Sequence, residues 1–227
     1  MSISNQLKRN IFADTSLWFL LLSNIITIFF AINENWSLST IIWIYWFQSI
    51  TIGFFNFIRI LCLKEFSTEG FKINGISAKP TQSTKVFTAF FFLFHYGFFH
   101  VVYAIFLLFG AFSAMYGENS ILGTFSAMHG NSPDATDLKY IFLTAMLFFI
   151  NHLFSYIYNR PRDTKKQNIG SLMFYPYVRI IPMHIIIMIS FSSGSSLFFF
   201  LMLKTFADIA MHIVEHDIIR KGEMQQV

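Results

Sequence analysis

Six long apolar segments constrain the fold of this chain more than any other feature. Each reaches the roughly 17–25 residues that a helix needs to cross the hydrocarbon core of a bilayer. We expect spans at about 16–32, 38–63, 86–112, 138–158, 173–191 and 195–215. The sequence therefore predicts an all-α, polytopic membrane helix bundle with six transmembrane helices. Residues 1–227 are expected to form a single transmembrane domain.

The composition supports a membrane protein and excludes several other classes. Only 12% of residues are charged, whereas a soluble domain averages about a quarter. The mean hydropathy is +0.54. The single cysteine, Cys62, excludes an internal disulfide framework and a CxxC metal or redox motif. The net charge of +4 comes from the loops, so it indicates membrane orientation and membrane lipids as partners, and no nucleic acid.

The distribution of loop charges predicts the orientation. Lysine and arginine gather before the first span, between the second and third, after the fourth and after the sixth. The alternate loops carry Glu34, Glu118, Asp134 and Asp137 with a single Lys139. By the positive-inside rule both termini are cytoplasmic. We expect an integral protein of the plasma (inner) membrane of a prokaryote.

Three connections carry further expectations. Residues 64–85 are polar, with glycine and proline, and are expected to be a flexible cytoplasmic connector. Residues 115–137, which include His129, are expected to form an outer loop. Residues 192–194 are too few to let the fifth and sixth spans be anything but antiparallel neighbours.

The sixth span carries an unusual polar stripe. Lys204, Asp208, His212 and His216 follow one another at intervals of four residues, so on a helix they share one slowly drifting face. An ionisable side chain at bilayer depth costs at least a few kcal/mol. The stripe is therefore expected to face protein or water, with Lys204 paired to Asp208 one turn away.

Other ionisable residues are expected at a similar depth. His95 lies in the third span, and Arg179 and His184 flank Pro182 in the fifth. Proline removes a backbone hydrogen bond, so we expect a kink that turns Arg179 and His184 inward. Counting residues from the cytoplasmic side places four of these side chains at a similar depth. We therefore predict that they converge near the membrane midplane or slightly on its cytoplasmic side: His95, His184, Asp208 and His212.

This set suggests a metal site. Imidazole and carboxylate groups suit zinc or iron, so the candidate ligands are His95, His184, Asp208, His212 and His216. The candidate catalytic residues are Asp208, Lys204 and Arg179. The chain contains none of the named metal motifs such as HExxH. A single histidine in a membrane helix is often only a hydrogen-bonding residue between helices.

The polar motifs resemble an uncharacterised family of prokaryotic six-helix integral membrane proteins. They are RxxPxH from Arg179 to His184 and KxxxDxxxHxxxH from Lys204 to His216. The likeness extends to WFQS at residues 46–49 and HYGxFH at residues 95–100. The resemblance implies a fold and no chemistry, since that family is defined by a domain of unknown function.

Four functions fit these residues. The first is a metal-dependent intramembrane enzyme that acts on a lipid or another apolar small molecule. The second is a proton- or ion-coupled transporter or channel in which Lys204, Asp208 and the histidines relay protons. The third is a haem protein with two histidine ligands. The fourth is a structural membrane protein without catalysis, whose polar residues hold helices together.

Overall fold

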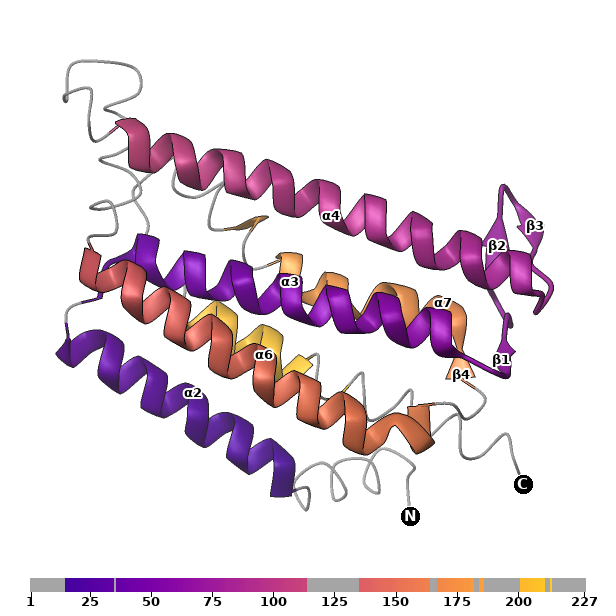
Figure 1. The fold of residues 1–227 in the computed structure, drawn as a ribbon, viewed down its shortest axis with the longest axis horizontal. Coiled ribbons are helices and arrows are strands. Elements are labelled where there is room, and N and C mark those ends of the chain that lie inside the picture. The colour runs from indigo at the N-terminus through magenta and orange to yellow at the C-terminus, as the bar shows by residue number, and fades with distance from the viewer. Residues whose placement is uncertain are drawn as a thin grey trace, which may run out of the picture.

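The computed structural model describes residues 15–34, 36–113, 135–163, 167–181, 184–185, 201–210 and 213. Four long helices run alongside one another: α2 (Thr15–Asn33), α3 (Leu38–Cys62), α4 (Gln82–Ser113) and α6 (Ala135–Asp163) (Figure 1). Helix α3 contacts both α4 and α6. Residues 201–210 form a further helical segment. The protein is thus a helical bundle with α3 between its neighbours.

Three of the described helices are long and apolar enough to cross a membrane. They cover Ser39–Cys62, Gln82–Leu108 and Thr136–Ile157, which matches the second, third and fourth predicted spans. The first predicted span coincides with α2, which has 19 residues. The sixth predicted span is represented by the helical residues 201–210. Six spans and cytoplasmic termini stay predictions.

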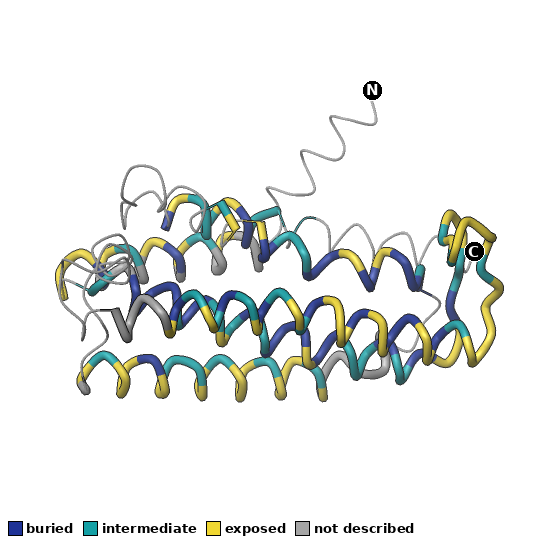
Figure 2. The backbone as a smooth tube through the Cα atoms, turned by 90° about the horizontal axis from the view of Figure 1, so that it is seen from above, coloured by how far each residue is buried: buried dark blue, intermediate teal, exposed yellow. Residues whose placement is uncertain are grey.

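The exposed surface of the helices is strongly apolar, as a lipid environment requires. In α3, 56% of the most apolar stretch is buried inside the protein, whereas in α6 only 6% is buried. Large apolar side chains on α4 and α6 are exposed, among them Phe94, Phe98, Phe142, Leu147 and Phe154. In Figure 2, where the backbone is coloured by burial, exposed residues recur along the length of the long helices. A water-soluble monomer rarely exposes so much contiguous apolar surface.

The contact between α3 and α4 depends on a glycine. A Cβ atom at Gly53 would lie only 2.4 Å from Cε1 of Tyr96, so the phenol ring rests directly on the α3 backbone. The Tyr96 hydroxyl donates to the Ser49 carbonyl oxygen at 3.0 Å and lies 2.7 Å from Ser49 Oγ. Further along, Trp46 Nε1 donates to the His100 carbonyl at 2.9 Å. These bonds fix the register of α3 against α4.

The fifth predicted span, 173–191, was expected to be one helix kinked at Pro182, but its first residues belong to two short helices. The chain forms a short helix α7 (Ile169–Phe174) and then the 3-10 helix η1 (Tyr175–Arg179). Pro176 lies in the first turn of η1 and has no N–H to continue an α-helical ladder. Asn56 Nδ2 donates to the Leu172 carbonyl at 2.9 Å, which ties α7 to α3.

Residues 64–85, predicted to be a flexible cytoplasmic connector, contain three short strands and, from Gln82, the first turn of α4. Strand β1 (Phe66–Ser67) pairs in parallel with β4 (Gln167–Asn168), and β2 (Lys72–Ile73) pairs antiparallel with β3 (Ile76–Ser77). The turn between β2 and β3 is Asn74–Gly75, both with positive φ. An Asn-Gly pair is a strong signal for a two-residue hairpin. The connector is therefore a small folded cap at one end of the bundle (Figure 1).

Several predictions fall on residues outside the described ranges. These are the kink at Pro182, the two last histidines of the stripe, the connection between the fifth and sixth spans, and most of the outer loop. The residues concerned are Pro182, His212, His216, His129, residues 192–194 and residues 114–134.

Candidate functional site

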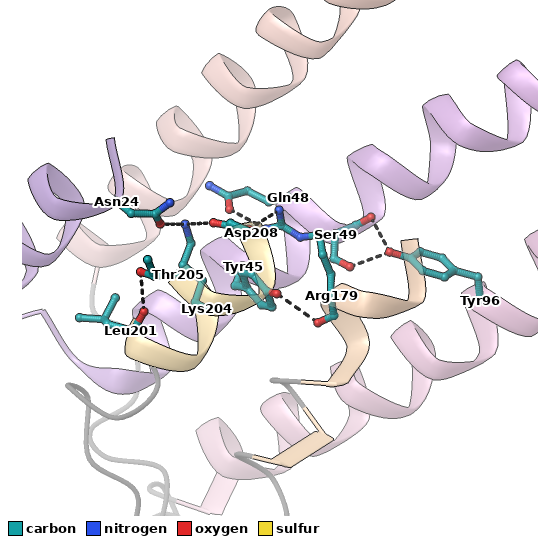
Figure 3. Close-up of polar contacts among 10 residues, drawn as sticks. All are labelled: Asn24, Tyr45, Gln48, Ser49, Tyr96, Arg179, Leu201, Lys204, Thr205 and Asp208. Carbon is teal, nitrogen blue, oxygen red and sulfur yellow. Dashed lines mark hydrogen bonds and ion pairs between the residues drawn. The ribbon is translucent and has the colours of Figure 1, made fainter. Parts of the chain in front are cut away.

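Arg179, Asp208 and Lys204 meet in one ionic cluster, which we call the triad. Arg179 Nη1 donates to Asp208 Oδ1 at 2.9 Å. Lys204 Nζ donates to the other carboxylate oxygen, Oδ2, at 2.7 Å. Each oxygen of Asp208 thus faces its own cation (Figure 3). These are the three residues predicted to be catalytic, and the predicted pairing of Lys204 with Asp208 is confirmed.

Two members of the triad, Arg179 and Asp208, are buried, and Lys204 is largely buried. The Arg179 side chain is 3% exposed, that of Asp208 is 5% exposed and that of Lys204 is 12% exposed. Taking a charge out of water costs several kcal/mol unless it is paired and hydrogen-bonded. A buried ion pair is therefore stable only when its charged groups are within hydrogen-bonding distance of each other and their remaining polar atoms are also bonded. Arg179 therefore faces the protein interior.

Neutral polar side chains complete the cluster. Lys204 Nζ also donates to Asn24 Oδ1 on α2 at 2.6 Å. Arg179 Nη2 donates to Gln48 Oε1 on α3 at 3.1 Å. The Arg179 guanidinium also lies over the ring of Tyr45, 4.4 Å from the ring centroid, as in a cation–π contact. The cluster therefore joins α2, α3, η1 and residues 201–210.

Local structure places each member of the triad. Lys204 and Asp208 are four residues apart on one helical segment, so their side chains lie on the same face. Arg179 is the last residue of η1, and the Tyr45 hydroxyl donates to its carbonyl oxygen at 3.1 Å. That bond holds the backbone of Arg179 against α3, so its side chain can reach both Gln48 and Asp208.

The triad carries one more positive charge than negative charge. Two cations face a single carboxylate, so its formal charge is +1 when all three groups are ionised. Arg179 Nε is buried and has no hydrogen-bond partner among the described residues. Leaving a buried donor unpaired costs about 1–3 kcal/mol. Both the excess charge and the unpaired donor would be relieved by a negatively charged group.

The histidines predicted to join Asp208 have other neighbours. His95 is exposed on α4, and its Nδ1 lies 2.8 Å from the Tyr177 hydroxyl. His184 is exposed as well, with its Nδ1 3.4 Å from the Tyr103 hydroxyl. The expectation that Arg179 turns inward is met, but His184 does not follow it.

The described residues contain no group of three or more histidine, cysteine, aspartate or glutamate side chains that could hold a metal ion. Asp208 is engaged by two cations, and the other described candidates, His95 and His184, lie against tyrosines. His212 and His216 lie outside the described ranges. The chemistry that the described triad offers is charge binding and proton exchange.

Sequence reasoning missed two members of the cluster. Asn24 and Tyr45 bind the triad but were not among the candidate residues. Asn24 is a carboxamide inside an apolar run, and this was a usable signal, since such residues tend to bond across helices. Tyr45 gave no signal, because an aromatic residue in an apolar segment is usual. Gln48 was visible as a polar residue of the second span and part of the WFQS motif.

Comparison with known proteins gives a family and no function. No curated protein and no solved structure matches the chain. One family model matches residues 6–224, which is nearly the whole chain. This agrees with the resemblance to an uncharacterised family that the motifs suggested. The chain belongs to DUF6498, a family of unknown function.

Proposed function

We propose that this protein is an integral membrane carrier and that the triad is its ionisable centre, where a proton is exchanged as an ion binds. The observation that supports this function best is the burial of three ionisable side chains with an excess positive charge. Ionisable residues within membrane segments are rare, and they mark ion pathways and proton relays. Six spans, cytoplasmic termini and a prokaryotic plasma membrane are part of the proposal.

The excess positive charge of the triad would couple the binding of a proton to the binding of an ion. The triad becomes neutral if Lys204 loses its proton, or if a negative charge joins it while Lys204 keeps its proton. Lys204 is faced by Asp208 on its own segment, by Asn24 on α2 and, across the carboxylate, by Arg179 on η1. In this low-dielectric setting proton occupancy and ion occupancy depend on each other. That mutual dependence is what a proton-coupled carrier requires.

A metal-dependent enzyme that acts on a lipid has less support among the described residues. Its proposed carboxylate ligand, Asp208, is bound by Arg179 and Lys204. A structural role has support from the hydrogen bonds that link four segments through the triad. The carrier and the structural role differ in one respect, because only the carrier has to move protons.

Proton movement can be measured after reconstitution. Purified protein is placed in liposomes that contain a pH-sensitive dye, and proton flux is followed after addition of sodium, potassium, chloride, phosphate or small carboxylate salts. We expect a solute-dependent flux in the natural protein that Lys204→Met abolishes. Thr205→Val is the matched control, since Thr205 lies beside Lys204 and, among the described residues, its hydroxyl donates to the Leu201 carbonyl of its own helix and to no member of the triad. A folded protein without flux under any of these salts would support the structural role instead.

A further inference from the structure

We propose that the triad binds a small monovalent carboxylate on the guanidinium edge of Arg179 formed by Nε and Nη2. This inference rests on the proposed carrier function for its biological use, but the binding itself does not require transport. Three observations on different groups lead to it: the charge of the triad, the unpaired donor of Arg179, and the nature of the residue beside that donor.

The charge selects an anion with one negative charge. Arg179 and Lys204 together carry two positive charges against the single negative charge of Asp208. A bound monoanion brings the buried group to neutrality, whereas a cation would raise its charge to +2. A dianion such as hydrogen phosphate would overshoot to −1. Since isolated charge is costly at bilayer depth, the monoanion is the favoured partner.

The unpaired donor selects the position. Arg179 uses Nη1 for Asp208 and Nη2 for Gln48, and its Nε is buried without a partner among the described residues. Nε and Nη2 lie on one edge of the planar guanidinium. Two parallel N–H donors on such an edge form a fixed fork that matches a carboxylate. A spherical halide ion cannot use both donors with the same geometry.

The neighbour of this edge is displaceable. Gln48 Oε1 accepts a hydrogen bond from Nη2 at 3.1 Å, but the amide is neutral and leaves the net charge of the triad unchanged. Gln48 is only half-buried. A carboxylate oxygen would form a stronger, charge-assisted bond with the same nitrogen. Gln48 therefore occupies Nη2 while the carboxylate is absent and gives it up when the carboxylate binds.

This role of Gln48 gives a sharp pair of variants. Gln48→Glu would place a carboxylate permanently beside the fork and supply the missing negative charge from within the chain. Gln48→Met has a similar size but supplies no charge and vacates Nη2. If the inference is right, the first variant blocks the site and the second leaves it open.

The test is equilibrium dialysis of the detergent-purified full chain with radiolabelled acetate. We expect about one acetate per chain for the natural protein and for Gln48→Met, and at least a tenfold weaker affinity for Gln48→Glu. The thermal unfolding midpoint of Gln48→Glu, measured without acetate, should lie above that of Gln48→Met. Excess unlabelled chloride should compete much less well than unlabelled acetate, and methylammonium should not compete.

Three results would overturn the inference: no acetate binding by the folded natural protein, equal affinity in Gln48→Glu, or equal competition by chloride. The outcome is separable from that of the carrier proposal. Acetate binding without proton flux in liposomes would contradict the carrier and leave the anion site intact. Proton flux without acetate binding would contradict the anion site and leave the carrier intact.

Discussion

Arg179 Nη1 donates to Asp208 Oδ1 at 2.9 Å, so two residues 29 positions apart form a buried ion pair between η1 and residues 201–210. The same carboxylate also binds Lys204. A single anion thus holds two cations inside the bundle. The stability of this region is expected to depend on Asp208 more than on either cation.

Replacing Asp208 by Asn should strongly destabilise the protein. The amide leaves the charges of Arg179 and Lys204 without a counter-charge among the described residues, and breaking a buried pair costs about 3–5 kcal/mol. The measurement is the thermal unfolding midpoint in detergent, followed by tryptophan fluorescence. The double variant Asp208→Asn with Lys204→Met should recover part of the loss, because it removes one unpaired charge. If the double variant were less stable than the single one, charge would not be the cause.

Replacing Gly53 by Ala should loosen the contact between α3 and α4. The new Cβ would lie 2.4 Å from Tyr96 Cε1, and the ring cannot swing freely while its hydroxyl is bound to Ser49. Such overpacking costs about 1–3 kcal/mol. Gly97→Ala is the matched control, because a Cβ there meets nothing within 4 Å. Equal unfolding midpoints for the two variants would contradict the described packing.

Replacing Lys85 by Met should weaken the end of the bundle next to the connector. Lys85 is buried, and its Nζ donates to the Leu63 carbonyl, just beyond the end of α3, at 2.7 Å. Loss of that donor leaves a buried carbonyl unpaired, which costs about 1–3 kcal/mol. Lys79→Met removes the same charge from an exposed position in the same connector. Unfolding by guanidinium should distinguish the two, and a loss of similar size in both would point to net charge as the cause.

Replacing Gly75 by Val should disrupt the β2–β3 hairpin and leave the helices intact. Gly75 has a φ of 79°, a left-handed conformation that costs a residue with a Cβ about 1–2 kcal/mol. Hydrogen exchange measured by mass spectrometry should show faster exchange in residues 72–77 and unchanged exchange in α3. Ser77→Ala serves as the control, since it changes a side chain in the same hairpin without constraining φ. Faster exchange throughout the bundle would contradict a locally confined effect.

Much of the helical architecture could be predicted from the sequence. The length of each apolar run sets the helix, because the chain needs about 20 residues to cross a bilayer. Predicted bounds of 38–63 and 138–158 compare with α3 at Leu38–Cys62 and α6 at Ala135–Asp163. The pairing of Lys204 with Asp208 was also predictable, since neighbours four residues apart on a helix share a face by local geometry alone.

The sequence by itself therefore determined which segments are helices and which side chains share a face within one helix. Only the tertiary structure decided which faces meet, and so it alone showed that Arg179, Asn24 and Gln48 surround the triad. It also placed His95 and His184 beside tyrosines. The physical reason is that periodicity and hydropathy describe one segment at a time and contain no information about its partner helix. The choice of partner helix depends on three-dimensional fit, such as the Tyr96 ring resting on the bare backbone of Gly53, which no local pattern encodes.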